Sequence, residues 1–563
     1  MSTAQSIRVA VAQFHVGADI AANLAKSLYW LDQASSCEPQ LVVLPEFCNH
    51  LSWYDDKQHC FGVSVTLDGP FLTAIADKAR ELGIHVVVNC TVQRPDGTAT
   101  GSSLLYSPEG ELLTDNTKQI YIGHENDFLE KADSEGPVVA TTLGKVGLYA
   151  CMDGVINETP RCLALNGAQL MLNSLNSFAT DEASLHIPVR AAENKVFVIA
   201  ANKVGPLVPE MMMEGISHAT GIPIRFLCGA GESQIVAPDG EVLAIASIDQ
   251  EEFVYADIDV SQANDKHRPD GTDIFTNRRP ELYRAITEDS SAQALPTMAG
   301  EQVMTVAVVQ LAAAADLGEM AARIDEAQRA GARLIALPPL AGDLDRLDQA
   351  AAFGEEVIAK ISGCCGDAVV ATSIVRENTG RYQYCGVLVG ADGVLLSQAQ
   401  VHASERHSFS APADTFETCE LPFGRVAIVP SDDSLYPETF RLLAMAGVEV
   451  AVVPLSPLED WELATGLLER SAENRINLLV APDTAAHGPG FITALQTDFT
   501  VMTEWRERPF DGLLSQPQWH RCDNQPGVYA HSIYPANAAN KVVSQNTDLL
   551  ADRPWQVSGA ISR

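Results

Sequence analysis

The chain has 563 residues, 46% of them hydrophobic and 20% charged, so it can build two large domains and does not have the composition of a disordered protein. Acidic residues outnumber basic ones by 73 to 37, and the net charge of −36 argues against binding nucleic acid or an anionic membrane. It fits a soluble cytosolic protein or a host with a salty cytoplasm.

The first part of the chain alternates predicted strands and helices. Arg8–Phe14 alternates with the period of two that is typical of a strand, and Leu41–Leu44 is a short apolar run typical of a buried one. Ala21–Ala34 has the apolar spacing of a helix, with Asp19 near its start. Further helices are predicted at Phe71–Glu81 and Glu158–Leu165, and further strands at Val86–Val92, Ser103–Tyr106, Glu111–Thr114, Val146–Ala150, Met171–Leu172, Val196–Ala200, Gly231–Val236 and Glu241–Ala246. This alternation predicts sheets with helices stacked outside them.

The same motifs occur a second time in the same order. The matching segments are IRVAVAQFHV (7–16) with VMTVAVVQL (303–311), QLVVLPEF (40–47) with RLIALPPL (333–340), GLYACMDGVINETPRCLALNG (147–167) with AIVPSDDSLYPETFRLLAMAG (427–447), and RAAEN (190–194) with RSAEN (470–474). This indicates two copies of one large domain rather than a short-period solenoid. We predict domains at 1–286 and 302–563, joined by a small, polar linker at 287–301. Packing of residues 287–299 as a C-terminal arm of the first copy is the alternative.

Nothing in the sequence indicates export, a membrane span or a metal site. The N-terminus lacks the pattern of a secretory signal, and no apolar run reaches the about 18 residues of a membrane helix. The 12 cysteines have no regular spacing, which is typical of reduced thiols in the cytoplasm. His50, His59 and Cys60 lie close together but not at zinc-ligand spacing. We therefore expect a cytoplasmic protein without a bound metal.

Four residues of the first copy are candidates for chemistry. Cys151 ends an apolar strand and precedes a helix, where a sharp turn exposes a nucleophile and the helix N-terminus lowers the pKa of a thiol. Glu46 follows the buried strand LVVLP, where a carboxylate is costly unless it faces a cleft or a cation. Lys118 and Glu125 alone read as surface charges, and a lone cysteine is more often a small core residue. The occurrence of all four residues in one chain is what makes them candidates for a catalytic site.

Together these residues resemble the nitrilase superfamily of carbon–nitrogen hydrolases. The motifs that carry the resemblance are LPEF, a lysine after the turn Pro108–Gly110, Glu125 in HENDF, Cys-x-Asp before a helix, and RAAEN followed by Asn202 and Gly205. The resemblance covers residues 6–285 and again 302–563. It implies an α/β fold of two αββα sandwiches in tandem, packed as an intramolecular pseudo-dimer of αββα–αββα type. It also implies that the chemistry needs no metal or organic cofactor.

The resemblance implies a role for each candidate. The roles are nucleophile for Cys151, general base for Glu46, stabilisation of the oxyanion for Lys118, and support of the lysine and of the substrate nitrogen for Glu125. The backbone N–H of Met152 is expected to help bind the oxyanion, and Asn173 is assigned to the same substrate and oxyanion site. An acyl-thioester would form, release ammonia or an amine, and be hydrolysed.

The residues after Cys151 favour a small amide as the substrate. True nitrilases usually have Trp-Glu at the position of Met152-Asp153, which argues against a nitrile. N-carbamoyl amino acid hydrolases use arginines near the position of Gly154 to hold a carboxylate, so an N-carbamoyl substrate needs Arg190 or Arg225 to substitute. Cys-x-Asp-Gly resembles the aliphatic amidases and formamidases, which act on small neutral amides. An N-carbamoyl amidohydrolase and a nitrilase stay as alternatives.

The second copy keeps the frame and lacks the chemistry. Pro339 stands at the position of Glu46, Ser431 at that of Cys151, and Val401 is aligned with Lys118. A serine without a base or lysine is not activated, so 302–563 is predicted to be non-catalytic. Because family members pair as two-fold dimers, the fusion would make the partner intramolecular. Further oligomerisation is open.

Three rival interpretations are weighed against the amidase. A papain-like pair of Cys151 with His124 or His186 has no histidine at a convincing position. A glutaminase-like subunit that supplies ammonia would need a separate synthetase. A non-catalytic scaffold fits the second copy but not the intact residues of the first.

Overall fold

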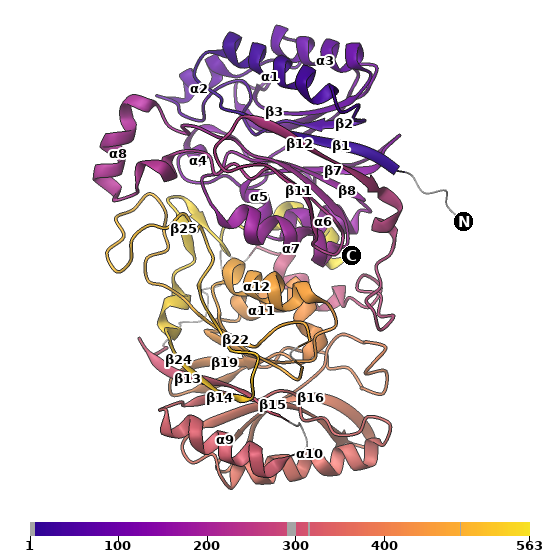
Figure 1. Cartoon of the computed structure of the whole chain (residues 1–563), viewed down its shortest axis with the longest axis vertical. Helices are drawn as coiled ribbons and strands as arrows, with labels where there is room; N and C mark the ends of the chain where they lie inside the picture. The colour runs from indigo at the N-terminus through magenta and orange to yellow at the C-terminus, as the bar shows by residue number, and fades with distance from the viewer. Residues whose placement is uncertain (1–5, 290–299, 313–315, 485) are drawn as a thin grey trace.

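The computed structural model describes residues 6–289, 300–312, 316–484 and 486–563. Two α/β halves are stacked along the long axis, and each contains two six-stranded sheets between helices (Figure 1). The layers follow the order αββα–αββα, which confirms the predicted fold. None of the helices in these ranges is both long and apolar enough to cross a membrane.

The two sheets of the first half share an interior. One sheet has the order β12 (Glu252–Asp259), β1 (Ser6–Gln13), β2 (Leu41–Val43), β3 (His85–Gln93), β4 (Ala99–Tyr106) and β5 (Leu112–Thr117). The other has the order β11 (Val242–Ile245), β10 (Gln234–Val236), β9 (Phe197–Ala201), β8 (Leu170–Ser174), β7 (Gly144–Ala150) and β6 (Val138–Thr141). The strands predicted for this half are all present, with ends that differ by a few residues.

The apolar periodicity of β1 explains how it joins two layers. Ala10 and Ala12 pack with the helices α1 (Ile20–Ser35) and α3 (Pro70–Leu82) on the outside. Val9 and Val11 point to the opposite face and pack against the second sheet. Successive side chains of a strand alternate between faces, so one short segment contributes to both cores.

The predicted helix boundaries have clear physical causes. The side chain of Asp19 accepts hydrogen bonds from the N–H groups of Ala21 and Ala22, a cap worth about 1 kcal/mol. Gly83 ends α3 in the left-handed conformation, with φ of 66°, which a residue without Cβ adopts at no steric cost.

The second half repeats this architecture. One of its sheets has the order β17 (Gly393–Ala399), β16 (Arg381–Gly390), β15 (Val369–Asn378), β14 (Leu334–Ala336), β13 (Met304–Gln310) and β24 (Gly527–Ile533). The other has the order β18 (Cys419–Leu421), β19 (Gly424–Ile428), β20 (Val450–Leu455), β21 (Asn477–Pro482), β22 (Phe491–Ala494) and β23 (Gln518–Arg521). Helices α9 (Leu317–Arg329) and α10 (Leu347–Ser362) cover the outer face (Figure 1). Most of the predicted linker, residues 290–299, lies outside the described residues.

The halves meet through four helices, α6 (Glu158–Leu165) and α7 (Ile187–Asn194) from the first and α11 (Pro437–Met445) and α12 (Leu467–Asn474) from the second (Figure 1). Buried ion pairs cross between them reciprocally: Arg161–Glu438 at 2.9 Å and Arg441–Glu158 at 2.8 Å, then Arg190–Glu473 at 2.7 Å and Arg470–Glu193 at 2.6 Å. Each pair is matched by its repeat equivalent, which is the self-complementarity of a two-fold interface. The tandem copies therefore form an intramolecular pseudo-dimer.

Candidate active site

Cys151 occupies a strained turn between β7 and the short helix α5 (Met152–Val155). Its backbone has φ of 48° and ψ of −109°, an unusual conformation for a residue with a side chain. The N–H of Cys151 donates to Oδ1 of Asn173 at 3.1 Å. Asn173 therefore anchors the backbone of Cys151, and it does not line the described pocket beside the site. We infer that Asn173 positions Cys151 rather than binding substrate.

The pKa of the Cys151 thiol differs from the sequence expectation. Cys151 is 7% exposed, and burial together with the Glu46 carboxylate raises the pKa of its thiol well above the usual value, although Lys118 opposes this. The helix that follows has only one turn, so its N-terminus does not overcome the loss of solvation. The expected lowering of the pKa is wrong for the resting site. A thiol with a raised pKa acts as a nucleophile only where a base can remove its proton.

Asp153 explains the Cys-x-Asp spacing. Its buried Oδ1 accepts hydrogen bonds from the N–H groups of Gln119, at 3.1 Å, and Ile120, at 2.8 Å. These residues directly follow Lys118, so the carboxylate joins the turn of the nucleophile to the segment that carries the lysine. A residue two positions after Cys151 thereby fixes the relative placement of both groups.

Glu46, Lys118 and Glu125 form one buried cluster. Nζ of Lys118 lies 2.8 Å from Oε1 of Glu46 and 3.0 Å from Oε2 of Glu125. Glu46 follows β2, Lys118 follows β5, and Glu125 begins the helix α4 (Glu125–Phe128). Three residues predicted from distant parts of the sequence are thus brought together.

The electrostatics of the cluster suit proton transfer. Burial raises the pKa of Glu46 to about 7, with partial opposition from Lys118, and Oε2 of Glu46 makes no hydrogen bond within the described residues. The two carboxylates hold the pKa of Lys118 well above its usual value despite burial. Near neutral pH the site therefore has a carboxylate that can accept a proton and a lysine that stays charged.

Sequence reasoning missed two further polar groups. Lys203 is fully buried near Phe47, whose carbonyl it contacts at 3.5 Å, and burial lowers its pKa to about 8. Asn176 lines the pocket next to Glu125, and its Oδ1 has no hydrogen-bond partner among the described residues. The signal for Lys203 was its place directly after Asn202 of the later motif; Asn176 had no local signal.

Neither candidate histidine contacts the nucleophile through the hydrogen bonds of the described chain. Nε2 of His124 lies 2.9 Å from the carbonyl oxygen of Ser52. His186 lies 2.8 Å from Oε2 of Glu469 and 3.0 Å from Oγ of Ser515, both in the second copy. His186 is an interface residue, and the geometry offers no Cys–His pair.

The arginines considered for a substrate carboxylate are also placed elsewhere. Arg190 is buried in the interface, where it pairs with Glu193, Glu469 and Glu473. It also donates to the carbonyl of Gly154 at 2.7 Å, which braces the helix after the nucleophile. Arg225 is exposed, and neither arginine lines the pocket beside the site.

Comparison with known proteins decides the family. The sequence pattern of the carbon-nitrogen hydrolases matches residues 8–268 and 305–496. The chain belongs to the carbon–nitrogen hydrolase family. It is therefore an enzyme that hydrolyses carbon–nitrogen bonds, and the two matched stretches correspond to the two halves of the structure.

Individual relatives of the hydrolase each match about half of it. A nitrilase of Pyrococcus abyssi is 30% identical over 263 residues, covering 46% of this chain and 92% of that protein. An omega-amidase of Bos taurus is 25% identical over 298 residues, covering 51% of this chain and 99% of that protein. A solved amidase structure from Nesterenkonia is similar at 25% identity with a TM-score of 0.40, covering 51% of this chain and 97% of that one.

The second half of the hydrolase corrects one sequence alignment. Asp433 accepts hydrogen bonds from the N–H groups of Val401, at 2.9 Å, and His402, at 2.8 Å. Asp153 does the same with the two residues that follow Lys118, so Gln400 is the counterpart of Lys118. The earlier alignment of Val401 was one residue off because the lengths of the loops differ.

The counterpart of the nucleophile is held by other groups. Oγ of Ser431 accepts hydrogen bonds from the N–H of Ser456 and from Nη2 of Arg406, both at 2.9 Å. Gln400 hydrogen-bonds to His407 at 2.8 Å, and Pro339 offers no carboxylate. A serine in these surroundings has no base aligned to activate it.

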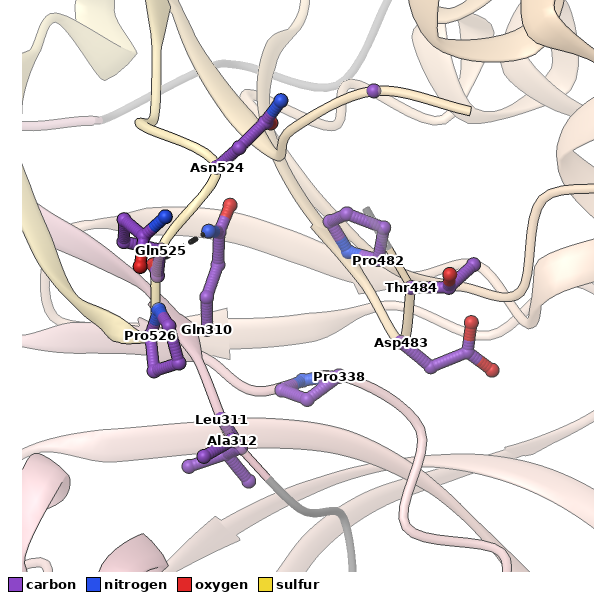
Figure 2. Close-up of a pocket in the computed structure, with 11 residues that line it drawn as sticks. Gln310, Leu311, Ala312, Pro338, Pro482, Asp483, Thr484, Asn524, Gln525 and Pro526 are labelled. Carbon is purple, nitrogen blue, oxygen red and sulfur yellow. Dashed lines mark hydrogen bonds between the residues drawn. The ribbon is translucent and has the colours of Figure 1, made fainter. Parts of the chain in front are cut away.

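A pocket remains in this half of the hydrolase. Figure 2 shows it between Gln310, which donates to the carbonyl of Gln525 at 2.9 Å, and the prolines Pro338 and Pro482. Asp483 is the one charged side chain among its described lining residues, which include no cysteine, histidine, lysine or arginine. The pocket therefore has a carboxylate, but among its described lining residues neither a thiol nor a cation accompanies it.

Proposed function

We propose that the protein is a thiol-dependent amidohydrolase that cleaves the non-peptide C–N bond of a small amide. It would release ammonia or an amine and a carboxylic acid, with an acyl-enzyme on Cys151. The buried Glu46–Lys118–Glu125 cluster, which acts electrostatically on the strained Cys151, carries this proposal. We assign residues 1–286 as the catalytic domain and 302–563 as its non-catalytic partner, with 287–301 as the linker.

In the first half-reaction, Sγ of Cys151 attacks the amide carbonyl while its proton passes to the carboxylate of Glu46. The ammonium of Lys118 and the N–H of Met152 stabilise the negative charge that develops on the carbonyl oxygen. Glu46 then returns the proton to the departing nitrogen, because an amine leaves readily only when protonated. A thioester and ammonia, or an amine, result.

In the second half-reaction, Glu46 removes a proton from a water molecule that attacks the thioester. The collapse of the tetrahedral intermediate releases the carboxylic acid, and the thiolate of Cys151 regains its proton from Glu46. Glu125 keeps Lys118 charged and in place through their 3.0 Å contact. The cycle consumes one amide and one water and needs no redox partner.

A panel of small amides, N-carbamoyl amino acids and nitriles tests this proposal by measurement of the released ammonia. We expect release from the amides that depends on Cys151 and is absent in the Cys151→Ala variant. Release of ammonia from nitriles alone, or from N-carbamoyl compounds alone, would show that the substrate belongs to that class and is not a small amide. Equal activity of parent and variant would refute the assigned nucleophile.

A further inference from the structure

The two halves differ in the lengths of two loops that connect equivalent strands. In the first half, β10 and β11 are joined by the short connection 237–241, whereas in the second half β22 and β23 are joined by the much longer 495–517. Conversely, the first half has a long segment, 202–233, between β9 and β10, where the second half has only 483–490. Each long segment is present in only one half, so neither is part of the two-fold symmetric architecture that the halves share.

The C-terminal part of the loop 495–517 is fixed to the first half by hydrogen bonds. The buried carboxylate of Asp181 accepts hydrogen bonds from the N–H groups of Leu514, at 2.9 Å, and Ser515, at 2.8 Å. The N–H of Thr180 donates to the carbonyl of Gly512 at 2.9 Å. A buried carboxylate satisfied by backbone donors of another segment is a strong fixed contact.

Close packing supports the same placement. Gly512 has φ of 89°, and a Cβ there would lie 2.4 Å from the ring of Phe226 in the first half. The ring of Phe510 is buried, with its centroid 5.4 Å from that of Phe226 and 5.9 Å from that of Phe178. The loop therefore joins an aromatic cluster that includes the long segment of the first half.

The same loop reaches the pocket beside the catalytic cluster. Val501 and Met502 line this cavity of about 110 Å³ together with Glu125 and Asn176. Met502 adopts φ of 61°, a conformation unfavourable for a residue with Cβ, so its placement is imposed by its surroundings. The N–H of Val501 donates to the carbonyl of Val543 at 2.8 Å, which joins the loop to a second segment of the same half, the one that contains Val543.

That second segment supports the residues between Lys118 and Glu125. Oγ of Ser544, in the strand β25 (Val542–Ser544), accepts a hydrogen bond from the N–H of Gly123 at 2.9 Å. Thr547 donates to the carbonyl of Tyr121 at 3.0 Å. The strand β25 packs near α8 (Met213–Thr220) in one apolar cluster (Figure 1).

Most side chains that line the pocket are apolar, and the polar lining residues are Ser52, His124, Glu125, Asn176 and Ser544. From the first half the pocket is lined mainly by Trp53, Phe178, Leu207, Val208, Ile222 and Phe226. None of the described lining residues is a lysine or an arginine. Transfer of a carboxylate into such surroundings without a cation is strongly unfavourable, whereas each methylene of a substrate gains from the transfer.

We propose that the loop 495–517 of the second copy forms one wall of the substrate pocket of the first copy and selects amides with an uncharged, apolar acyl chain. This inference rests on the proposed amidase function. The second copy then contributes to specificity as well as to the interface. Binding energy from the chain is expected to raise kcat/KM by about fourfold per methylene until the cavity is filled.

The test compares pentanamide with glutaramate, an amide of equal chain length that ends in a carboxylate. In the parent protein we expect kcat/KM for pentanamide to exceed that for glutaramate at least about tenfold. Met502→Arg places a cation in the wall and is expected to reduce this ratio about tenfold, whereas Met502→Glu is expected to increase it. A role in packing alone would move both variants in the same direction.

Met211→Arg is the matched control, because Met211 is 93% exposed and does not line the pocket, whereas Met502 is 42% exposed within it. The ratio is expected to be unchanged in this variant. An equal ratio in the parent, Met502→Arg and Met502→Glu would overturn the inference while the amidase function stands. Absence of Cys151-dependent ammonia release from acetamide and pentanamide alike would instead refute the proposed function on which it rests.

Discussion

The two halves of this chain have the same arrangement of sheets and interface helices but differ in the residues at the candidate active site. Each has two six-stranded sheets, and each contributes equivalent arginines and glutamates to the interface. Cys151 and Phe47, next to the proposed base, have positive φ, whereas Ser431 is not among the described residues with that strain. The interface is therefore separable from the strained turn at Cys151 and from the Glu46–Lys118–Glu125 cluster. A half can lose the latter two and still serve as a partner.

Asp153 and Asp433 have the same structural role in the two halves, although only the first half has the candidate catalytic residues. Both accept hydrogen bonds from two successive backbone N–H groups of the neighbouring segment. Removal of either would leave buried donors without partners, which costs about 1–3 kcal/mol for each group. Lys118 instead pairs with the buried carboxylates of Glu46 and Glu125, and the second half has Pro339 at the position of Glu46, so Gln400 there leaves no such carboxylate at Pro339 unpaired.

The largest expected effect is on the nucleophile. Cys151→Ala is expected to lower the rate of amide hydrolysis by about 10⁴-fold or more, whereas Ser431→Ala is expected to leave it unchanged. Ammonia release measures both, and thermal unfolding checks that each variant is folded. Comparable losses in the two variants would mean that both halves catalyse.

The next largest effect is that of pH on the first half. Because Glu46 must be deprotonated to accept the thiol proton and its pKa is raised to about 7, kcat/KM is expected to fall as the pH drops below about 7. The decrease approaches tenfold per pH unit well below that value. A profile that stays flat down to pH 5 would exclude Glu46 as the base.

Removal of one interface arginine is expected to act on stability first. Arg190→Ala leaves the buried carboxylates of Glu469 and Glu473 short of a partner, and a loss of about 3–5 kcal/mol in the free energy of unfolding is expected. Activity falls as well, because Arg190 holds the carbonyl of Gly154.

Arg470→Ala is the matched variant, since Arg470 pairs with Glu193 and Glu473 in the equivalent place. Denaturant unfolding is expected to show a similar loss, with a smaller decrease of kcat at temperatures where both variants are folded. Equal effects on kcat would show that Arg190 has no special link to the nucleophile turn.

No change in activity is expected when a thiol is introduced into the second half. Ser431→Cys in a Cys151→Ala background restores a thiol but neither a base at Pro339 nor a cation at Gln400, so ammonia release is expected to stay at the background level. Measurable hydrolysis by this variant would show that the second half keeps a working site and that the two centres differ less than described.

Local patterns made much of this account predictable from sequence. The period-two alternation of β1, the cap at Asp19 and the glycine after α3 depend on neighbouring residues, and they placed these elements correctly. Glu46, Lys118, Glu125 and Cys151 were identified through motifs and then found in one place or in mutual electrostatic contact.

The features that sequence did not reveal depend on contacts between distant segments. The raised pKa of Cys151 follows from burial, which no motif reports. Asn176 gains its interest from the pocket that it lines, and Gln400 was misplaced by one residue because the loops before it vary in length. The position of 495–517 over the first half depends on Asp181, far away in the chain.

We infer that the chain has one catalytic centre, in its first half. Intact mass spectrometry of the protein, quenched with acid during turnover of a small amide, tests it most directly by counting acyl groups per chain. With one catalytic centre we expect a single acyl adduct, mapped to Cys151 by peptide analysis. Two adducts per chain, or an adduct on any residue of 302–563, would contradict it.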